Sequence, residues 1–132
     1  MKLYVMNSIR TNNFNDEHMI DNIKTMWEEA YRQLEKYPNS VYGIYYDYES
    51  DYKGDYSLGV AIEEPRGELS IELPDNGKYE VFQVDSSDEM GVIKAWQKIW
   101  EQEEAGALKR AYSYDFEKYS PNGNIEIYIA IL

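Results

Sequence analysis

Residues 46–49 read Tyr-Asp-Tyr-Glu, and residues 114–117 repeat them as Tyr-Asp-Phe-Glu, 68 positions further along the chain. Trp27 and Trp96 recur at nearly the same offset, 69 residues apart. A one-residue difference between the two offsets is what a small insertion produces. The sequence therefore predicts two copies of one structural unit, in residues 1–64 and 68–132.

The two halves show the same order of expected elements. Apolar residues at helical spacing predict one helix in each half, and alternating or β-branched segments predict the strands. The expected helices cover 19–34 and 92–100, the strands 3–10, 41–49, 56–62, 69–73, 79–84, 111–119 and 125–132, and the loops 51–55, 63–68, 74–77 and 120–123.

Each half thus reads as a strand-helix-strand-strand unit. Two such units join into one antiparallel sheet with both helices on one face. We therefore expect an α+β fold in a single domain over residues 1–132. A ligand would lie on the sheet face without helices, or in the groove between the units.

Composition narrows the classes of partner. The chain has 132 residues, no cysteine and a formal charge of −12. Disulfides and thiolate metal sites are excluded, and an acidic surface without a basic face repels nucleic acid and anionic membranes. No apolar run approaches the ~20 residues of a membrane span. We expect a cytoplasmic protein without a direct nucleic-acid or membrane partner.

Fourteen tyrosines are unusual for this length. A tyrosine presents an apolar ring and one polar tip, and with carboxylates nearby such rings attract organic cations. Tyrosine also favours strands, which accounts for some of the fourteen. Tyr42, Tyr45 and Tyr48 recur every third residue, so they face opposite sides of a strand unless a bulge intervenes.

The last expected strand, 125–132, alternates strictly. Its isoleucines are expected to face the helices, which turns Glu126 and Tyr128 to the other side of the sheet. A carboxylate beside a tyrosine on a central strand predicts either a solvated outer face or the floor of an aromatic cleft. In the second case, Glu126 would lie at that floor and favour a cationic guest.

The usual catalytic signatures are missing from the sequence. His18 is the single histidine and is expected at the surface, so a triad or a histidine metal cluster has little to build on. No Walker loop and no Gly-x-Gly-x-x-Gly motif occurs. No cofactor and no metal are expected. A general acid or base made from Glu117 or Glu126 is the chemistry that remains.

The tyrosine-rich run at 42–56 resembles the motif of GyrI-like small-molecule-binding proteins, the AraC-type effector-binding family. Within it, the chain is most similar to the stand-alone branch of integron-associated effector-binding proteins. Four further segments carry this resemblance: Arg-Thr-Asn-Asn at 10–13, Ala-Trp-Gln-Lys-Ile-Trp at 95–100, Tyr-Asp-Phe-Glu-Lys-Tyr at 114–119, and Ile-Glu-Ile-Tyr-Ile-Ala-Ile at 125–131.

The resemblance implies two strand-helix-strand-strand units around a central aromatic cleft with a glutamate at its floor. It implies cationic, lipophilic, drug-like ligands, and some members of the family hydrolyse strained cyclopropane-containing natural products. The ligand-binding residues expected by match to the motif are Glu126, Glu117, Tyr128, Tyr45, Tyr48, Tyr114 and Trp96. Regulators of this family carry a helix-turn-helix domain before the effector domain; here the first strand begins almost at once, so we expect none and consider a separate regulator protein as a partner.

Three functions follow as hypotheses. The first is a module that senses or sequesters small organic cations. The second is a hydrolase that activates water with Glu117 or Glu126. The third is a protein-interaction module that presents an acidic surface to a basic partner, whose binding would weaken steeply with salt.

Overall fold

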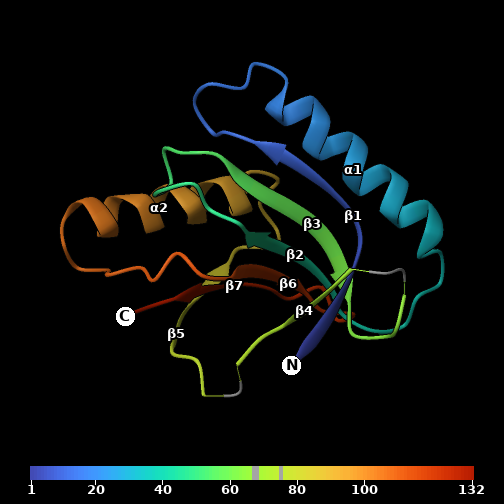
Figure 1. Ribbon diagram of the computed structural model, residues 1–132. Helices are drawn as coiled ribbons and strands as arrows, with labels where there is room; N and C mark the ends of the chain where they lie inside the picture. Colours follow the sequence, from blue (N-terminus) through green and yellow to red (C-terminus); the bar gives the residue numbers. More distant parts are fainter. Residues whose placement is uncertain (67–68, 75) are drawn as a thin grey trace.

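The computed structural model describes residues 1–66, 69–74 and 76–132 (Figure 1). Gly67 and Glu68 of the predicted loop between the halves, and Asp75 of the predicted turn, lie outside the described residues. Two helices and seven strands follow one another as β1 (Lys2–Thr11), α1 (Met19–Gln33), β2 (Val41–Tyr46), β3 (Tyr56–Ile62), β4 (Ser70–Glu72), β5 (Tyr79–Val84), α2 (Gly91–Glu104), β6 (Asp115–Tyr119) and β7 (Ile125–Ala130).

All seven strands form one sheet in the order β4-β1-β3-β2-β6-β7-β5, and every neighbouring pair is antiparallel. The predicted α+β class, with two helices on an antiparallel sheet, is confirmed. The order β1-β3-β2 is mirrored by β6-β7-β5 across the central β2–β6 pair. That is the arrangement a duplicated unit would give; the duplication and its boundaries stay a prediction.

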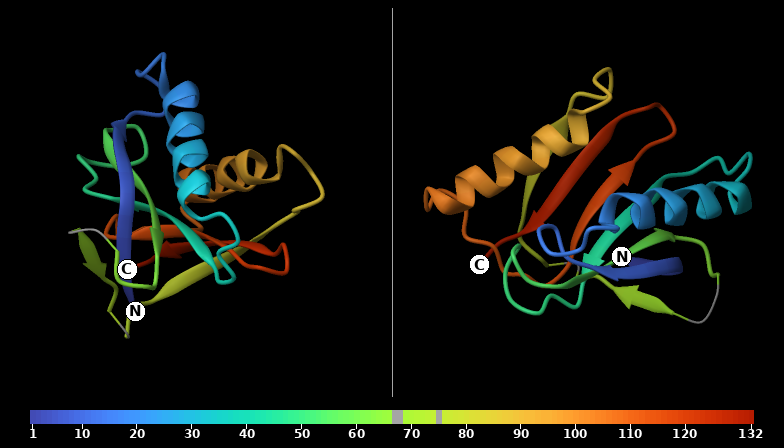
Figure 2. Two further views of the ribbon diagram at one scale, coloured as in Figure 1. Left: turned by 90° about the vertical axis from the view of Figure 1, so that its right-hand side faces the viewer. Right: turned by 90° about the horizontal axis from the view of Figure 1, so that it is seen from above.

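Both helices cover the same face of the curled sheet (Figures 1 and 2). Helix α1 packs on β1 and β3, and α2 packs on β5. The ring of Tyr45 on β2 touches the core cluster under α1 and also the cluster under α2. The central strands β2 and β6 therefore lie below the gap between α1 and α2. Their side chains on the helix face point into that gap.

Alternation decides which face each side chain occupies. On β7, Ile127 and Ile129 pack under α2 with Trp96 and Ile99, as predicted. The opposite face of the sheet is also filled, by a cluster built on Leu3, Tyr42, Ile44, Phe116 and their neighbours. The sheet is thus covered by helices on one side and curls around its own side chains on the other.

Several element ends differ from the prediction, among them the C-terminal end of α2, which lies at Glu104 instead of residue 100. Strand β2 stops at Tyr46 because Asp47 takes a positive φ of 50°, which ends the extended backbone. Strand β6 begins at Asp115 rather than residue 111, and Tyr112 before it has a φ of 54°. Helix α2 begins at Gly91, where Asp88 accepts the backbone N–H of Met90. Within the described part of the chain, no helix combines the length and apolar composition that a membrane crossing requires.

Candidate functional site

A cavity of about 450 Å³ lies between the two helices and the central strands. Both predicted units contribute to its wall, and most of the lining is aromatic or aliphatic. The lining residues are Asn13, Met19, Ile20, Ile23, Lys24, Trp27, Tyr45, Tyr48, Tyr52, Tyr56, Leu58, Val92, Ile93, Trp96, Trp100, Arg110, Glu117 and Tyr119. Apolar walls with a few converging polar groups are typical of small-molecule sites.

Glu117 is the acidic residue in this wall. Its position on β6 turns it toward the helices, and it is only 3 % exposed. Oε2 accepts hydrogen bonds from the Tyr45 hydroxyl and from Nε1 of Trp96, both at 2.7 Å, and Oε1 accepts one from the Tyr119 hydroxyl, also at 2.7 Å. Three neutral donors from β2, α2 and β6 therefore fix this carboxylate in place.

Gly43 makes room for that arrangement. It pairs with Glu117 across the β2–β6 ladder. A Cβ at Gly43 would lie 3.0 Å from Cζ2 of Trp27 and 3.1 Å from Oε1 of Glu117. Only a residue without a side chain lets the Trp27 ring and the Glu117 carboxylate approach the same point of the sheet.

Burial raises the pKa of Glu117, because removal from water disfavours the charged form, while the bonds from Trp96, Tyr45 and Tyr119 oppose that rise. Burial, together with the charge of Glu117, raises the pKa of Tyr45 well above its usual value, and the pKa of Tyr119 rises for the same two reasons. Both phenols therefore remain protonated hydrogen-bond donors. Among the residues that the structure describes, no Lys, Arg or His side chain forms an ion pair with Glu117.

Arg110 is the buried cation of the wall, and other carboxylates hold it. Nη2 lies 2.8 Å from Oδ2 of Asp115, and Nη1 lies 3.4 Å from Oε1 of Glu103. The guanidinium also lies 4.3 Å from the ring centre of Tyr112. Asp115 in turn accepts the hydroxyl of Tyr48 and the backbone N–H of Ala130. The charge of Arg110 is thus neutralised within the wall, although its Nε has no hydrogen-bond partner among the described residues, and none of these contacts involves Glu117.

The positive φ of Asp47 explains how two tyrosines at odd spacing reach one cavity. Tyr45 faces the helices from within β2, and Tyr42, three residues earlier, packs on the opposite face. The left-handed turn at Asp47 then brings Tyr48 back to the helix side, where its hydroxyl bonds to Asp115. A backbone turn rather than a bulge therefore resolves the tyrosine spacing.

The mouth of the cavity lies between the helices. Ile20 on α1 and Ile93 on α2 line the cavity, yet they are 71 % and 50 % exposed. Lys24 on α1 is a further exposed lining residue. The rim therefore combines exposed isoleucines with the charged Lys24, and it opens toward the wall that holds Glu117.

The structure brings four of the predicted site residues together: Glu117, Tyr45, Tyr48 and Trp96 line the cavity. It does not bring Glu126, Tyr128 or Tyr114 there. Glu126 accepts a hydrogen bond at 2.9 Å from Nε2 of Gln83 on the edge strand β5. Tyr128 stacks on Phe116 with ring centres 4.6 Å apart, and Tyr114 packs on the same cluster of the opposite face.

The expected position of Glu126 at the cavity floor is therefore corrected, and Glu117 holds that position. The physical reason is the side of the sheet. The prediction allowed the cleft either on the face without helices or between the units, and Glu126 could lie at its floor only in the first case. The hollow lies on the helix face, between the units. The β7 residues on that face, Ile127 and Ile129, are buried under α2.

Several residues that line the cavity were not predicted from the sequence. Trp27 and Tyr119 had a usable signal: Trp27 is the counterpart of Trp96 in the repeat, and Tyr119 ends the segment 114–119. Tyr56 closes the tyrosine-rich run. Arg110 had no signal, because it lies in an irregular segment before β6 and pairs with Asp115 only in the folded chain.

Comparison with known proteins finds one matching family and a similar solved structure. Residues 4–131 match the family model described as Cass2, integron-associated effector binding protein. The chain also resembles a solved integron cassette protein from the mobile metagenome of Vibrio cholerae, with a TM-score of 0.76 and 29 % identity over 99 % of this chain and 90 % of that one. A search of curated proteins gave no match.

Proposed function

The chain belongs to the Cass2 family of integron-associated effector-binding proteins, and from this premise we propose that the cavity between its helices binds a small lipophilic organic cation against Glu117. Membership of an effector-binding family indicates small-molecule binding. The charge and polarity of the ligand are our inference from the cavity wall. Sensing or sequestration of such cations is the function that the site supports best.

The observation that carries the proposal is that the buried carboxylate of Glu117 has hydrogen-bond donors but no cationic partner among the described residues. A buried carboxylate is costly unless a cation or several donors compensate it. Here three neutral donors hold it, and no cation of the described chain pairs with it. A ligand that brings its own positive charge supplies the missing partner, and its apolar body gains from the aromatic wall.

The rings around Glu117 fit a cation better than an anion. Tyr45 and Trp96 lie with ring centres 4.9 Å apart, and Trp27 and Tyr119 meet at 5.1 Å near the other side of the carboxylate. Aromatic faces attract cations and give large apolar contact. An anionic guest would meet the unpaired Glu117 charge at close range, which excludes it from this wall.

A titration with a fluorescent styrylpyridinium cation tests the proposal. We expect saturable binding to the wild-type chain and a loss of about tenfold or more in Glu117→Gln, the scale of one desolvated charge contact. Glu126→Gln is the matched control, because it removes a carboxylate from the neighbouring strand on the other face. Equal loss in both variants, or no loss in either, would rule out Glu117 as the counter-charge.

A further inference from the structure

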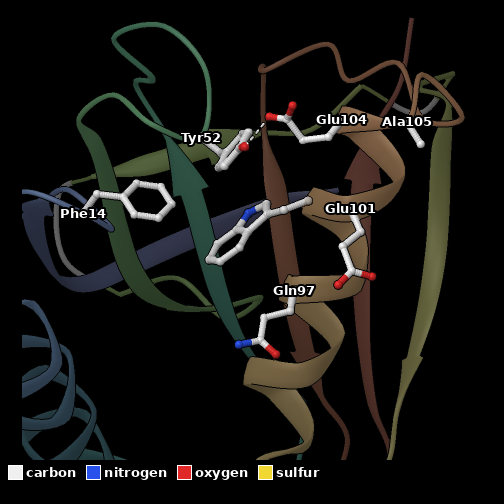
Figure 3. A pocket seen from close by; sticks show the side chains of 7 residues that line it. Phe14, Tyr52, Gln97, Glu101, Glu104 and Ala105 are labelled. Atoms are coloured by element: carbon white, nitrogen blue, oxygen red, sulfur yellow. Dashed lines mark hydrogen bonds between the residues drawn. The ribbon is translucent and has the colours of Figure 1, made fainter.

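A second hollow lies outside the cavity, against the C-terminal half of α2 (Figure 3). It measures about 840 Å³, and Phe14, Tyr52, Trp100, Glu101 and Glu104 are among its lining residues. Tyr52 and Trp100 line the inner cavity as well. These two rings therefore form a partition with one hollow on each side.

The partition presents an aromatic surface to the outer hollow. Tyr52 and Trp100 are stacked, with ring centres 5.6 Å apart and planes 16° from parallel. The ring of Phe14 lies 6.0 Å from each of them and is itself 59 % exposed. Phe14 and Tyr52 face the same space in Figure 3. Large aromatic rings held open to solvent in a hollow are typical of a place where a flat molecule lies.

The charge around these rings is negative. Glu101 and Glu104 project from α2 into the lining, and the Tyr52 hydroxyl donates to Glu104. Lys53 lies 3.7 Å from Glu104, with both side chains largely exposed, so water weakens that pair. In the described part of the chain, Glu101 has no ion-pair partner. The hollow thus keeps an excess of negative charge.

We propose that this outer hollow is a second binding site, which takes a planar organic cation beside Glu101. The cation stacks on the free face of the Tyr52–Trp100 pair and meets the Phe14 ring at its edge, because Phe14 is tilted by 67° to Tyr52 and by 50° to Trp100. The chain then holds one cation at Glu117 and another outside the partition. The outer site differs in its chemistry: it is open, aromatic and salt-sensitive, whereas the inner site is enclosed. The site at Glu117 and the outer site stand or fall separately, because Phe14, Glu101 and Glu104 line only the outer hollow.

Calorimetric titration with thioflavin T, a planar cation, tests this directly. The wild-type chain should show two binding events. Glu117→Gln should lose the inner event and keep the outer one. Phe14→Ala and Glu101→Gln should each weaken the outer event about threefold to fivefold, the scale of one exposed cation–aromatic or charge contact, and leave the inner event unchanged.

Glu28→Gln, which removes an exposed charge from α1 away from both hollows, is the control and should change neither event. Raising the salt concentration should weaken the outer event more than the inner one. A single event that Glu117→Gln abolishes would overturn the outer site and leave the proposed function standing. A single event that survives Glu117→Gln but weakens in Phe14→Ala would do the reverse. An outer event that Glu28→Gln weakens as much as Glu101→Gln would reduce it to general charge attraction and overturn the proposal.

Discussion

Asp115 and Glu117 lie two residues apart on β6 and face the same side of the sheet, but of these two carboxylates only Asp115 has a cationic partner among the described residues. Nη2 of Arg110 lies 2.8 Å from Oδ2 of Asp115, and both side chains are almost fully buried. Glu117, equally buried, has Tyr45, Trp96 and Tyr119 as donors instead. One strand therefore carries a carboxylate that a buried arginine neutralises and a carboxylate that only neutral donors hold.

This difference predicts that removal of the two carboxylates will affect stability to very different extents. Asp115→Asn leaves Arg110 buried without its carboxylate and should lower the free energy of unfolding by about 3–5 kcal/mol. Glu117→Gln removes a buried charge that has no ion-pair partner, and should change that free energy by about 1 kcal/mol or less. Urea unfolding of both variants at neutral pH measures the two values. Similar large losses in both would show that Glu117 is a structural charge.

Cation affinity should depend on pH through Glu117. Because burial raises its pKa, affinity should be full above the raised value and fall as the pH drops through it, since protonation removes the counter-charge. Calorimetric titrations at a series of pH values give the profile, and the profile of Glu117→Gln should be flat. A wild-type profile without an inflection, or one retained in Glu117→Gln, would contradict this assignment.

The stability of the unliganded chain should change in the opposite sense. The folded state binds the Glu117 proton more tightly than the unfolded state, so this group contributes stability at low pH. That contribution is lost as the pH rises from the ordinary carboxyl pKa through the raised one. The difference in unfolding free energy between wild type and Glu117→Gln, measured across this window, should follow that slope; a difference that grows in favour of wild type with rising pH would contradict it.

Gly43→Ala adds a single methyl group, yet it should both destabilise the fold and disturb the cavity wall around Glu117. The new Cβ would crowd Cζ2 of Trp27 and Oε1 of Glu117, and overpacking of this kind costs about 1–3 kcal/mol. Cation affinity of the folded variant should fall with it. Gly59→Ala is the control, because its Cβ would meet Val5 and Asn7 away from the cavity. That variant should lose stability and keep its affinity; if Gly43→Ala behaved the same way, the spacing around Glu117 would be irrelevant to binding.

We expect the bound molecule to leave the cavity chemically unchanged. Three donors occupy Glu117, which leaves one acceptor position on Oε1 and makes the carboxylate a fixed charge rather than a free base for water. Mass analysis after incubation with a cyclopropane-bearing natural product should show no added water. A product heavier by one water that disappears in Glu117→Gln would instead establish the hydrolase.

Much of the fold could be predicted because periodicity reports on burial. Ile127 and Ile129 of β7 and much of the stripes of α1 and α2 pack where their spacing placed them, whereas Ile20, Tyr31 and Ile93 of the stripes stay largely exposed. Strand ends were less predictable. The turn at Asp47 depends on a left-handed φ, which an aspartate tolerates but which its presence in the sequence does not predict. The irregular segment before β6, with Tyr112 at positive φ, gave no signal either.

The sequence identified some residues of the candidate site but not the face of the sheet on which the cavity lies. Strand alternation shows which side chains share a face of the sheet. It places Glu126 on the same face as Tyr128, and Glu117 on the same face as Tyr119. It does not tell which face is hollow, because that depends on how far apart α1 and α2 lie above β2 and β6. Glu117, the carboxylate that lines the cavity, was therefore available as a candidate, but its placement there rather than Glu126 depends on the packing of the helices.

The central claim is that Glu117 selects for positive charge, and a pair of isosteric ligands tests it most directly. The para-hydroxyphenyl-trimethylammonium ion and para-tert-butylphenol differ by one atom, a charged nitrogen in place of a carbon. Calorimetry should show the cation binding at least about tenfold more tightly to wild type, with the preference lost in Glu117→Gln and kept in Glu126→Gln. Equal affinity of the two molecules for wild type, or a preference that survives in Glu117→Gln, would contradict the account.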